Sequence, residues 1–156
     1  MADEVMAAVG AAVELGRAGE RGAARDALAG LWERVGEGGD ALHRCSVAHY
    51  LADLQDDLTD ELVWDLRALA AVSDLDDQRA RRYDGAWQVR AFLPSLHLNL
   101  ADVYRRLGRL AESREHLAVA VTHVDALPDD EYGAMIRGGV DRVGTALASG
   151  SRGALE

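Results

Sequence analysis

Apolar residues recur at steps of three and four along most of this chain, the spacing that gathers them on one face of an α-helix. Alanine supplies much of the apolar content, only 5% of the residues are aromatic, and no run of β-branched residues occurs. Alanine suits closely packed helices better than sheets. Only two prolines, Pro94 and Pro128, stand in the chain. The sequence therefore predicts an all-α fold.

The periodic segments predict about seven helices in one domain of residues 1–150. Asp40 is a suitable N-cap for the third helix, and Thr59 or Asp60 for the fourth. Pro94 is expected to bend the fifth helix, because proline removes a hydrogen bond from the helical ladder. The polar stretch 73–85 is expected to be a connection or a helix end exposed to water. The predicted elements are helical hairpins over about 3–36, 40–73 and 86–126, a capping helix over about 129–148, and a tail over 151–156.

The segment between the two prolines carries a known pattern. Leu100, Ala101 and Tyr104 share one side of its first helix, Leu107-Gly108 makes a turn, and Leu117 and Ala120 follow on the second helix. This arrangement resembles the tetratricopeptide repeat, although Ser113 stands where that family usually has alanine. The resemblance implies antiparallel hairpins stacked as a short right-handed solenoid.

The resemblance also implies a function. In such proteins the first helix of each hairpin lines a concave groove that binds a peptide or a partner protein. Carried onto this chain, the groove would present Tyr50, Asp53, Asn99, Asp102, Arg105 and Arg106. The amide of Asn99 offers a donor and an acceptor, which suits a peptide bond, and an arginine can hold a carboxylate through two hydrogen bonds. We therefore expect a non-enzymatic adaptor.

Charge and composition exclude several other classes. A formal net charge of −10 argues against nucleic acid and anionic membranes as partners. The chain contains no lysine, which excludes Schiff-base chemistry and a phosphate-binding-loop lysine. Cys45 is the single cysteine, so no internal disulfide can form. Asp3 and Glu4 stand where an export signal carries positive charge, so we expect a cytoplasmic protein.

We expect no cofactor and no metal. Cys45, His49 and Asp53 share a face of one predicted helix, but the outer two lie about 12 Å apart, too far for a metal site without help from elsewhere. Two alternatives to the adaptor stay open. One is self-association, possible as a homodimer through the glycine-rich last helix. The other, less favoured, is a small-molecule sensor or enzyme with a pocket near His49, Asp53 and His97.

Overall fold

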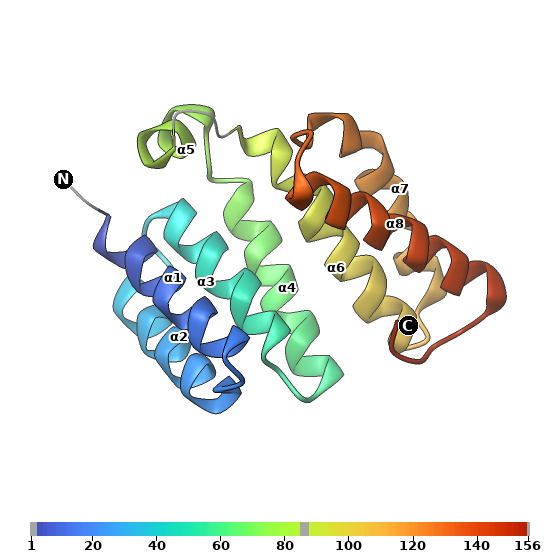
Figure 1. The fold of residues 1–156 in the computed structure, drawn as a ribbon, viewed down its shortest axis with the longest axis horizontal. Coiled ribbons are helices and arrows are strands. Elements are labelled where there is room, and N and C mark those ends of the chain that lie inside the picture. The colour runs from blue at the N-terminus through green and yellow to red at the C-terminus, as the bar shows by residue number, and fades with distance from the viewer. Residues whose placement is uncertain (1–2, 85–87, 156) are drawn as a thin grey trace. The chain divides into compact units, whose positions relative to one another are not determined.

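The computed structural model describes residues 3–84 and 88–155, and every regular element within those ranges is a helix (Figure 1). The predicted all-α class is confirmed. The chain divides into two compact units, Met1–Trp87 and Gln88–Glu156, and each contains its own hydrophobic cluster.

The first unit is built from two helical hairpins and a short fifth helix. Its elements are α1 (Glu4–Arg17), α2 (Arg21–Val35), α3 (Ala41–Asp53), α4 (Leu58–Val72) and α5 (Asp77–Tyr83). Helix α1 packs against α2, and α3 packs against both α2 and α4. Helix α5 lies within the stretch expected to be a connection, and its Ala80 is fully buried. A short polar helix has a weak apolar stripe, which is why the periodicity did not predict it.

Aspartates fix the beginnings of the helices in this unit. The carboxylate of Asp3 accepts from the N–H of Met6 at the start of α1, and that of Asp40 accepts from Leu42 and His43 at the start of α3. Asp40 is thus the N-cap that the sequence predicted. Helix α4 is capped by Asp57, rather than by Thr59 or Asp60, whose backbone N–H groups it accepts from. These bonds satisfy amides that have no partner inside their own helix.

The core of the first unit comes from the apolar stripes of α1, α2 and α3. Val9, Ala12, Leu28, Leu31, Val47 and Leu51 are all buried there. Trp32 and Trp64 pack against this cluster with their rings in an edge-to-face arrangement, 5.1 Å between centroids. Arg67 stacks over Trp64, with its guanidinium carbon 4.4 Å from a ring centroid.

The second unit is a hairpin with one further long helix packed on it. Its elements are η1 (Val89–Ala91), α6 (Leu93–Arg106), α7 (Leu110–His123), η2 (Val124–Ala126) and α8 (Glu131–Ser149). Pro94 lies in the first turn of α6 instead of bending a longer helix. That position needs no intrahelical N–H, so proline costs nothing there.

Helix α8 packs on both α6 and α7. Its buried residues Ile136, Val140, Val143 and Leu147 join Leu98, Ala101, Ala120 and Leu127 in one cluster. Gly139 lets α6 come close, because a Cβ at this position would lie 2.7 Å from Leu98. A glycine that weakens an isolated helix thus permits close packing within the unit.

No helix within residues 3–84 and 88–155 is long and apolar enough to cross a membrane.

Candidate functional site

Helix α6 brings three of the predicted binding residues into direct contact. Nε and Nη2 of Arg105 donate to Oδ1 of Asp102 at 3.2 and 2.8 Å, and Nε of Arg106 donates to Oδ2 of the same carboxylate at 3.0 Å. These residues follow one another at helical spacings of three and four, which places their side chains side by side. The carboxylate of Asp102 therefore fixes the orientation of two guanidinium groups.

Arg105 also binds the main chain of the segment that follows α8. Its Nη1 donates to the carbonyl oxygen of Ser151 and its Nη2 to that of Gly153, both at 2.7 Å. The side chain is fully buried. A buried guanidinium is stable only when its donors are satisfied, and here four of its hydrogen bonds are made within the unit.

Gly150 directs this C-terminal segment, residues 150–155, back towards α6. Its φ of 75° is left-handed, and the next amide, that of Ser151, donates to the carbonyl oxygen of Ala146 at 2.9 Å. This geometry ends a helix and reverses the chain. The segment then returns beside the turn between α6 and α7 (Figure 1), where the guanidinium of Arg152 covers Gly108. A Cβ on Gly108 would lie 2.6 Å from Cζ of Arg152.

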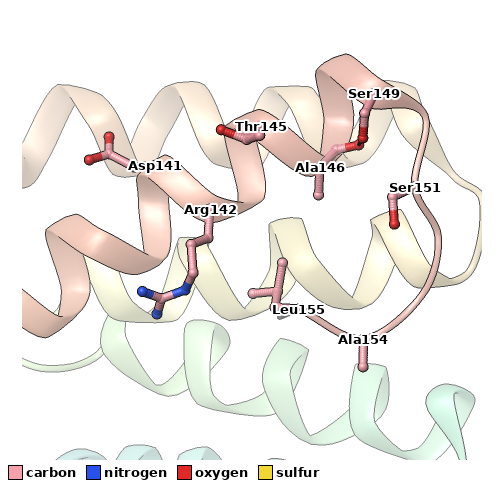
Figure 2. Close-up of a pocket in the computed structure, with 8 residues that line it drawn as sticks. All are labelled: Asp141, Arg142, Thr145, Ala146, Ser149, Ser151, Ala154 and Leu155. Atoms are coloured by element: carbon pink, nitrogen blue, oxygen red, sulfur yellow. Dashed lines mark hydrogen bonds between the residues drawn. The ribbon is translucent and has the colours of Figure 1, made fainter.

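A hollow of about 470 Å³ remains between the C-terminal segment and α8 (Figure 2). Its walls are Asp141, Arg142, Thr145, Ala146 and Ser149 of α8, and Ser151, Ala154 and Leu155 of the segment. The C-terminal segment therefore leaves open space along α8, and Arg105 binds it through two main-chain carbonyl groups.

Two histidines join α6 to α7 through their rings. Nδ1 of His97 and Nδ1 of His116 are 2.9 Å apart, and the ring centroids are 5.2 Å apart. The distance between the ring centroids exceeds the distance between the two nitrogens by about two ring radii. The nitrogens therefore lie between the rings, close to the line that joins the centroids, and face each other. That is the geometry of an N–H···N hydrogen bond, in which one imidazole donates and the other accepts. Tyr104 stacks on His116, with 5.4 Å between the ring centroids.

The surroundings of His97 favour its neutral form. Burial, followed by the nearby charges of His116 and His123, lowers the pKa of His97 to about 4. Burial also lowers the pKa of His116, against the opposing effect of Glu115 and Glu112. A neutral pair can share a single proton along the bond, whereas two imidazolium ions could not face each other in this way.

The remaining predicted residues lie on two helices. Asn99 is half-buried on α6, one turn before Asp102. Tyr50 and Asp53 lie on α3 of the first unit, where Tyr50 packs against the hydrophobic cluster and contacts the ring of His49. A groove that joins the α3 and α6 residues stays a prediction, as does the alternative pocket near His49, Asp53 and His97.

Cys45 is buried on α3, and burial raises the pKa of its thiol to about 12. The thiol is therefore protonated at neutral pH, which makes it a poor nucleophile and metal ligand. Within residues 3–84 and 88–155, no group of three or more His, Cys, Asp or Glu side chains is arranged to hold a metal ion.

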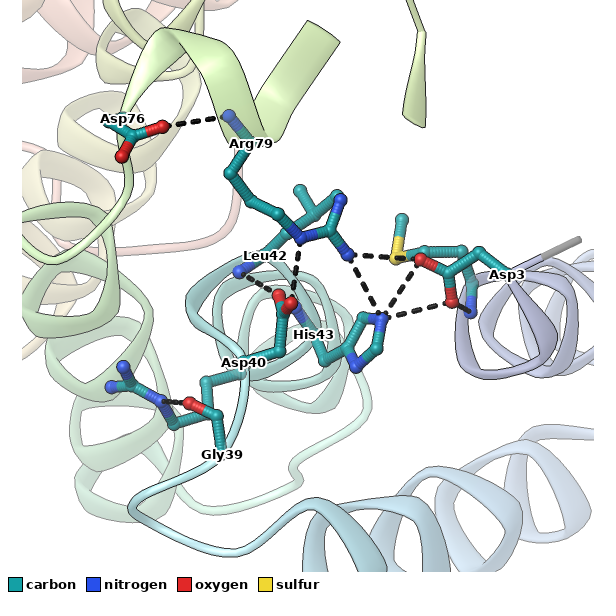
Figure 3. A network of polar contacts seen from close by, with 9 residues as sticks. Asp3, Gly39, Asp40, Leu42, His43, Asp76 and Arg79 are labelled. Atoms are coloured by element: carbon teal, nitrogen blue, oxygen red, sulfur yellow. Dashed lines mark hydrogen bonds and ion pairs between the residues drawn. The ribbon is translucent and has the colours of Figure 1, made fainter. Parts of the chain in front are cut away.

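A charged network joins α5 to the rest of the first unit (Figure 3). Arg79 donates from Nε to Oδ2 of Asp40 at 2.7 Å and from Nη2 to Oδ2 of Asp3 at 3.1 Å. Nε2 of His43 lies 2.9 Å from both oxygens of Asp3. Each of these side chains is at most one third exposed. One arginine thus links α5 to the N-termini of both α1 and α3.

The burial of Arg105 was not predicted from the sequence. A signal was present, because Leu98, Ala101 and Arg105 are spaced by three and four residues and so place the arginine on the apolar stripe. No comparable signal exists for the His97–His116 pair, which depends on how α6 and α7 pack.

Comparison of the chain with protein-family models, curated proteins and solved structures gives no match.

Proposed function

We propose that this chain is a non-enzymatic binding protein that holds a peptide segment of a partner protein along α6. The observation that supports this proposal is the bonding of Arg105. Its guanidinium already binds two main-chain carbonyl groups, those of Ser151 and Gly153, at 2.7 Å each. A site that binds main-chain carbonyl groups of its own chain has the donors needed for those of another chain.

Asn99, Asp102 and Arg106 form the rest of the proposed surface on α6. Asp102 holds both arginines in a fixed orientation, which lowers the entropic cost of binding. The guanidinium of Arg106 provides a positive charge for a carboxylate of the partner. Tyr50 and Asp53 are proposed to extend the binding surface on α3.

The test is a pull-down from native cell extract, followed by an affinity measurement on any protein retained. The wild type is compared with the Asn99→Ala, Arg106→Glu double variant and with Arg114→Glu, a charge reversal at an exposed position of α7. We expect the double variant to bind the partner at least tenfold more weakly and Arg114→Glu to bind it like the wild type. Equal affinity for all three would remove α6 as the binding surface.

Self-association is a second candidate function, favoured by one feature of α8. Tyr132 and Met135, one turn apart, are 42% and 58% exposed. Large apolar side chains exposed together are typical of protein contacts. Sedimentation over a wide concentration range tests this candidate, because the mass of a monomer at every concentration would contradict self-association.

A further inference from the structure

The C-terminal segment, residues 150–155, is exposed along its length, although its large apolar side chain, Leu155, is only 36% exposed. The segment therefore buries little apolar surface apart from that of Leu155, and its gain from the hydrophobic effect is small. The rest of its attachment comes from hydrogen bonds to its main chain, which water or another peptide could replace.

Two of these hydrogen bonds involve only main-chain atoms of the segment. Ser151 and Gly153 are two residues apart, and the chain bends at Gly153. Nη1 and Nη2 of Arg105 each donate to one of their carbonyl oxygens, at 2.7 Å. Arg105 therefore binds two main-chain carbonyl groups at this spacing and not a particular pair of side chains.

Arg152, the residue between the two carbonyl groups, contacts the turn between α6 and α7. Its guanidinium packs against Gly108, and a Cβ on Gly108 would lie 2.6 Å from Cζ of Arg152. Gly108 also needs to be glycine for its turn, because its φ is 79°. The bare backbone at this turn thus accommodates a long, flat side chain at the middle position of the bound segment.

We propose that the C-terminal segment is an intramolecular ligand of the Arg105 site, and that a partner's peptide segment binds only by displacing it. This inference rests on the proposed function and adds to it the class of partner: a peptide segment recognised by two main-chain carbonyls two residues apart, with arginine at the position between them. A tethered ligand acts at an effective concentration on the order of millimolar. The C-terminal segment therefore sets the affinity that a partner must exceed.

The probe for this proposal is a fluorescent synthetic peptide with the sequence of residues 149–155, titrated by fluorescence anisotropy. Three proteins are compared: the full chain, a chain that ends at Gly150, and that shortened chain with Arg105→Gln. We expect the shortened chain to bind the peptide at least tenfold more tightly than the full chain. Arg105→Gln should abolish that gain, whereas Arg114→Gln in the shortened chain should preserve it.

A full-length variant provides a second test that does not depend on the deletion. Arg152→Glu removes the guanidinium over Gly108 while it leaves the chain intact. We expect its affinity for the peptide to lie between those of the full and shortened chains, with unchanged helicity by circular dichroism. Equal affinity of the peptide for the full chain, the Arg152→Glu variant and the shortened chain would overturn the proposal. The proposal would also fail if the shortened chain with Arg105→Gln bound the peptide as tightly as the shortened chain without that substitution.

The outcome also separates this inference from the proposed function. If a cellular partner binds the full and shortened chains equally tightly, the C-terminal segment does not compete, and the adaptor function stands without it. If the shortened chain binds the peptide but no cellular partner is found, the intramolecular site stands and the adaptor function loses its support.

Discussion

Ser113 donates a hydrogen bond from its hydroxyl to the carbonyl oxygen of Ala101 at 2.6 Å, and its side chain is fully buried between α6 and α7. Alanine, the usual residue at this position in the family that the hairpin resembles, would make no such bond. We expect Ser113→Ala to lower the free energy of unfolding by about 1 kcal/mol, measured by urea denaturation. Ser149→Ala is the control, because its hydroxyl bonds to the carbonyl of Ala146 on the exposed surface. An equal decrease in the free energy of unfolding for both variants would show that the buried hydrogen bond stabilises the fold no more than the exposed one.

His97 gives the second unit a stability that depends on pH. Its folded-state pKa of about 4 lies below the ordinary value of 6.5. As the pH falls from 6.5 to 4, the unfolded chain binds a proton at this ring, whereas the folded chain does not. The free energy of unfolding is therefore highest above this pH range and decreases within it. After allowance for solvent screening, we expect a loss of roughly 1–2 kcal/mol across the window.

The measurement is the difference in unfolding free energy between pH 7 and pH 4.5 for the wild type and for His97→Gln. The variant removes one titrating ring from the N–H···N pair, so its stability should change less with pH. A variant as sensitive to pH as the wild type would assign the effect to other groups.

At the scale of the element, α5 shows how one side chain positions a short helix. A helix of seven residues is unstable alone, and its buried apolar surface centres on Ala80. Arg79 also links α5 to the unit, because it donates hydrogen bonds to the N-cap aspartates of α1 and α3. Burial raises the pKa of both aspartates, but hydrogen bonds outweigh it and lower the pKa of each: those of His43, Met6 and Arg79 at Asp3, and those of Arg79 and His43 at Asp40.

We therefore expect Arg79→Gln to loosen α5 without unfolding the hairpins. Limited digestion with trypsin measures this, since the chain has no lysine and α5 contains Arg81 and Arg82. Cleavage after these two residues should become several times faster in the variant. Arg17→Gln should leave the rate unchanged, because Arg17 pairs with Glu14 on the open surface. An unchanged rate in Arg79→Gln would show that the bonds of Arg79 do not hold the helix in place.

At the scale of the whole molecule, each compact unit has a hydrophobic cluster of its own. A unit with its own core can fold alone. We expect fragments 1–84 and 88–156 to be helical when they are produced separately, and their circular dichroism spectra to sum to that of the intact chain. A fragment with the spectrum of a random coil would show that its core is incomplete without the rest of the protein.

The sequence by itself determined the helical class, because helical periodicity is a local property. Periodicity of the apolar residues identified the long helices, and Asp40 was correctly placed at the start of one of them. Three of the predicted binding residues, Asp102, Arg105 and Arg106, do contact one another, since helical spacing alone brings them together.

Only the tertiary structure decided which distant side chains meet. Arg105 reaches carbonyl groups 46 and 48 residues away, and Arg79 reaches Asp3 across 76 residues. Such contacts depend on how helices pack and how turns such as that at Gly150 redirect the chain. Helical periodicity describes which face of one helix is apolar, but it carries no information about the polar group that packing brings opposite. For that reason the apolar stripe of α6 could indicate that Arg105 is buried, whereas its bonds to the carbonyl groups of Ser151 and Gly153 could not be predicted.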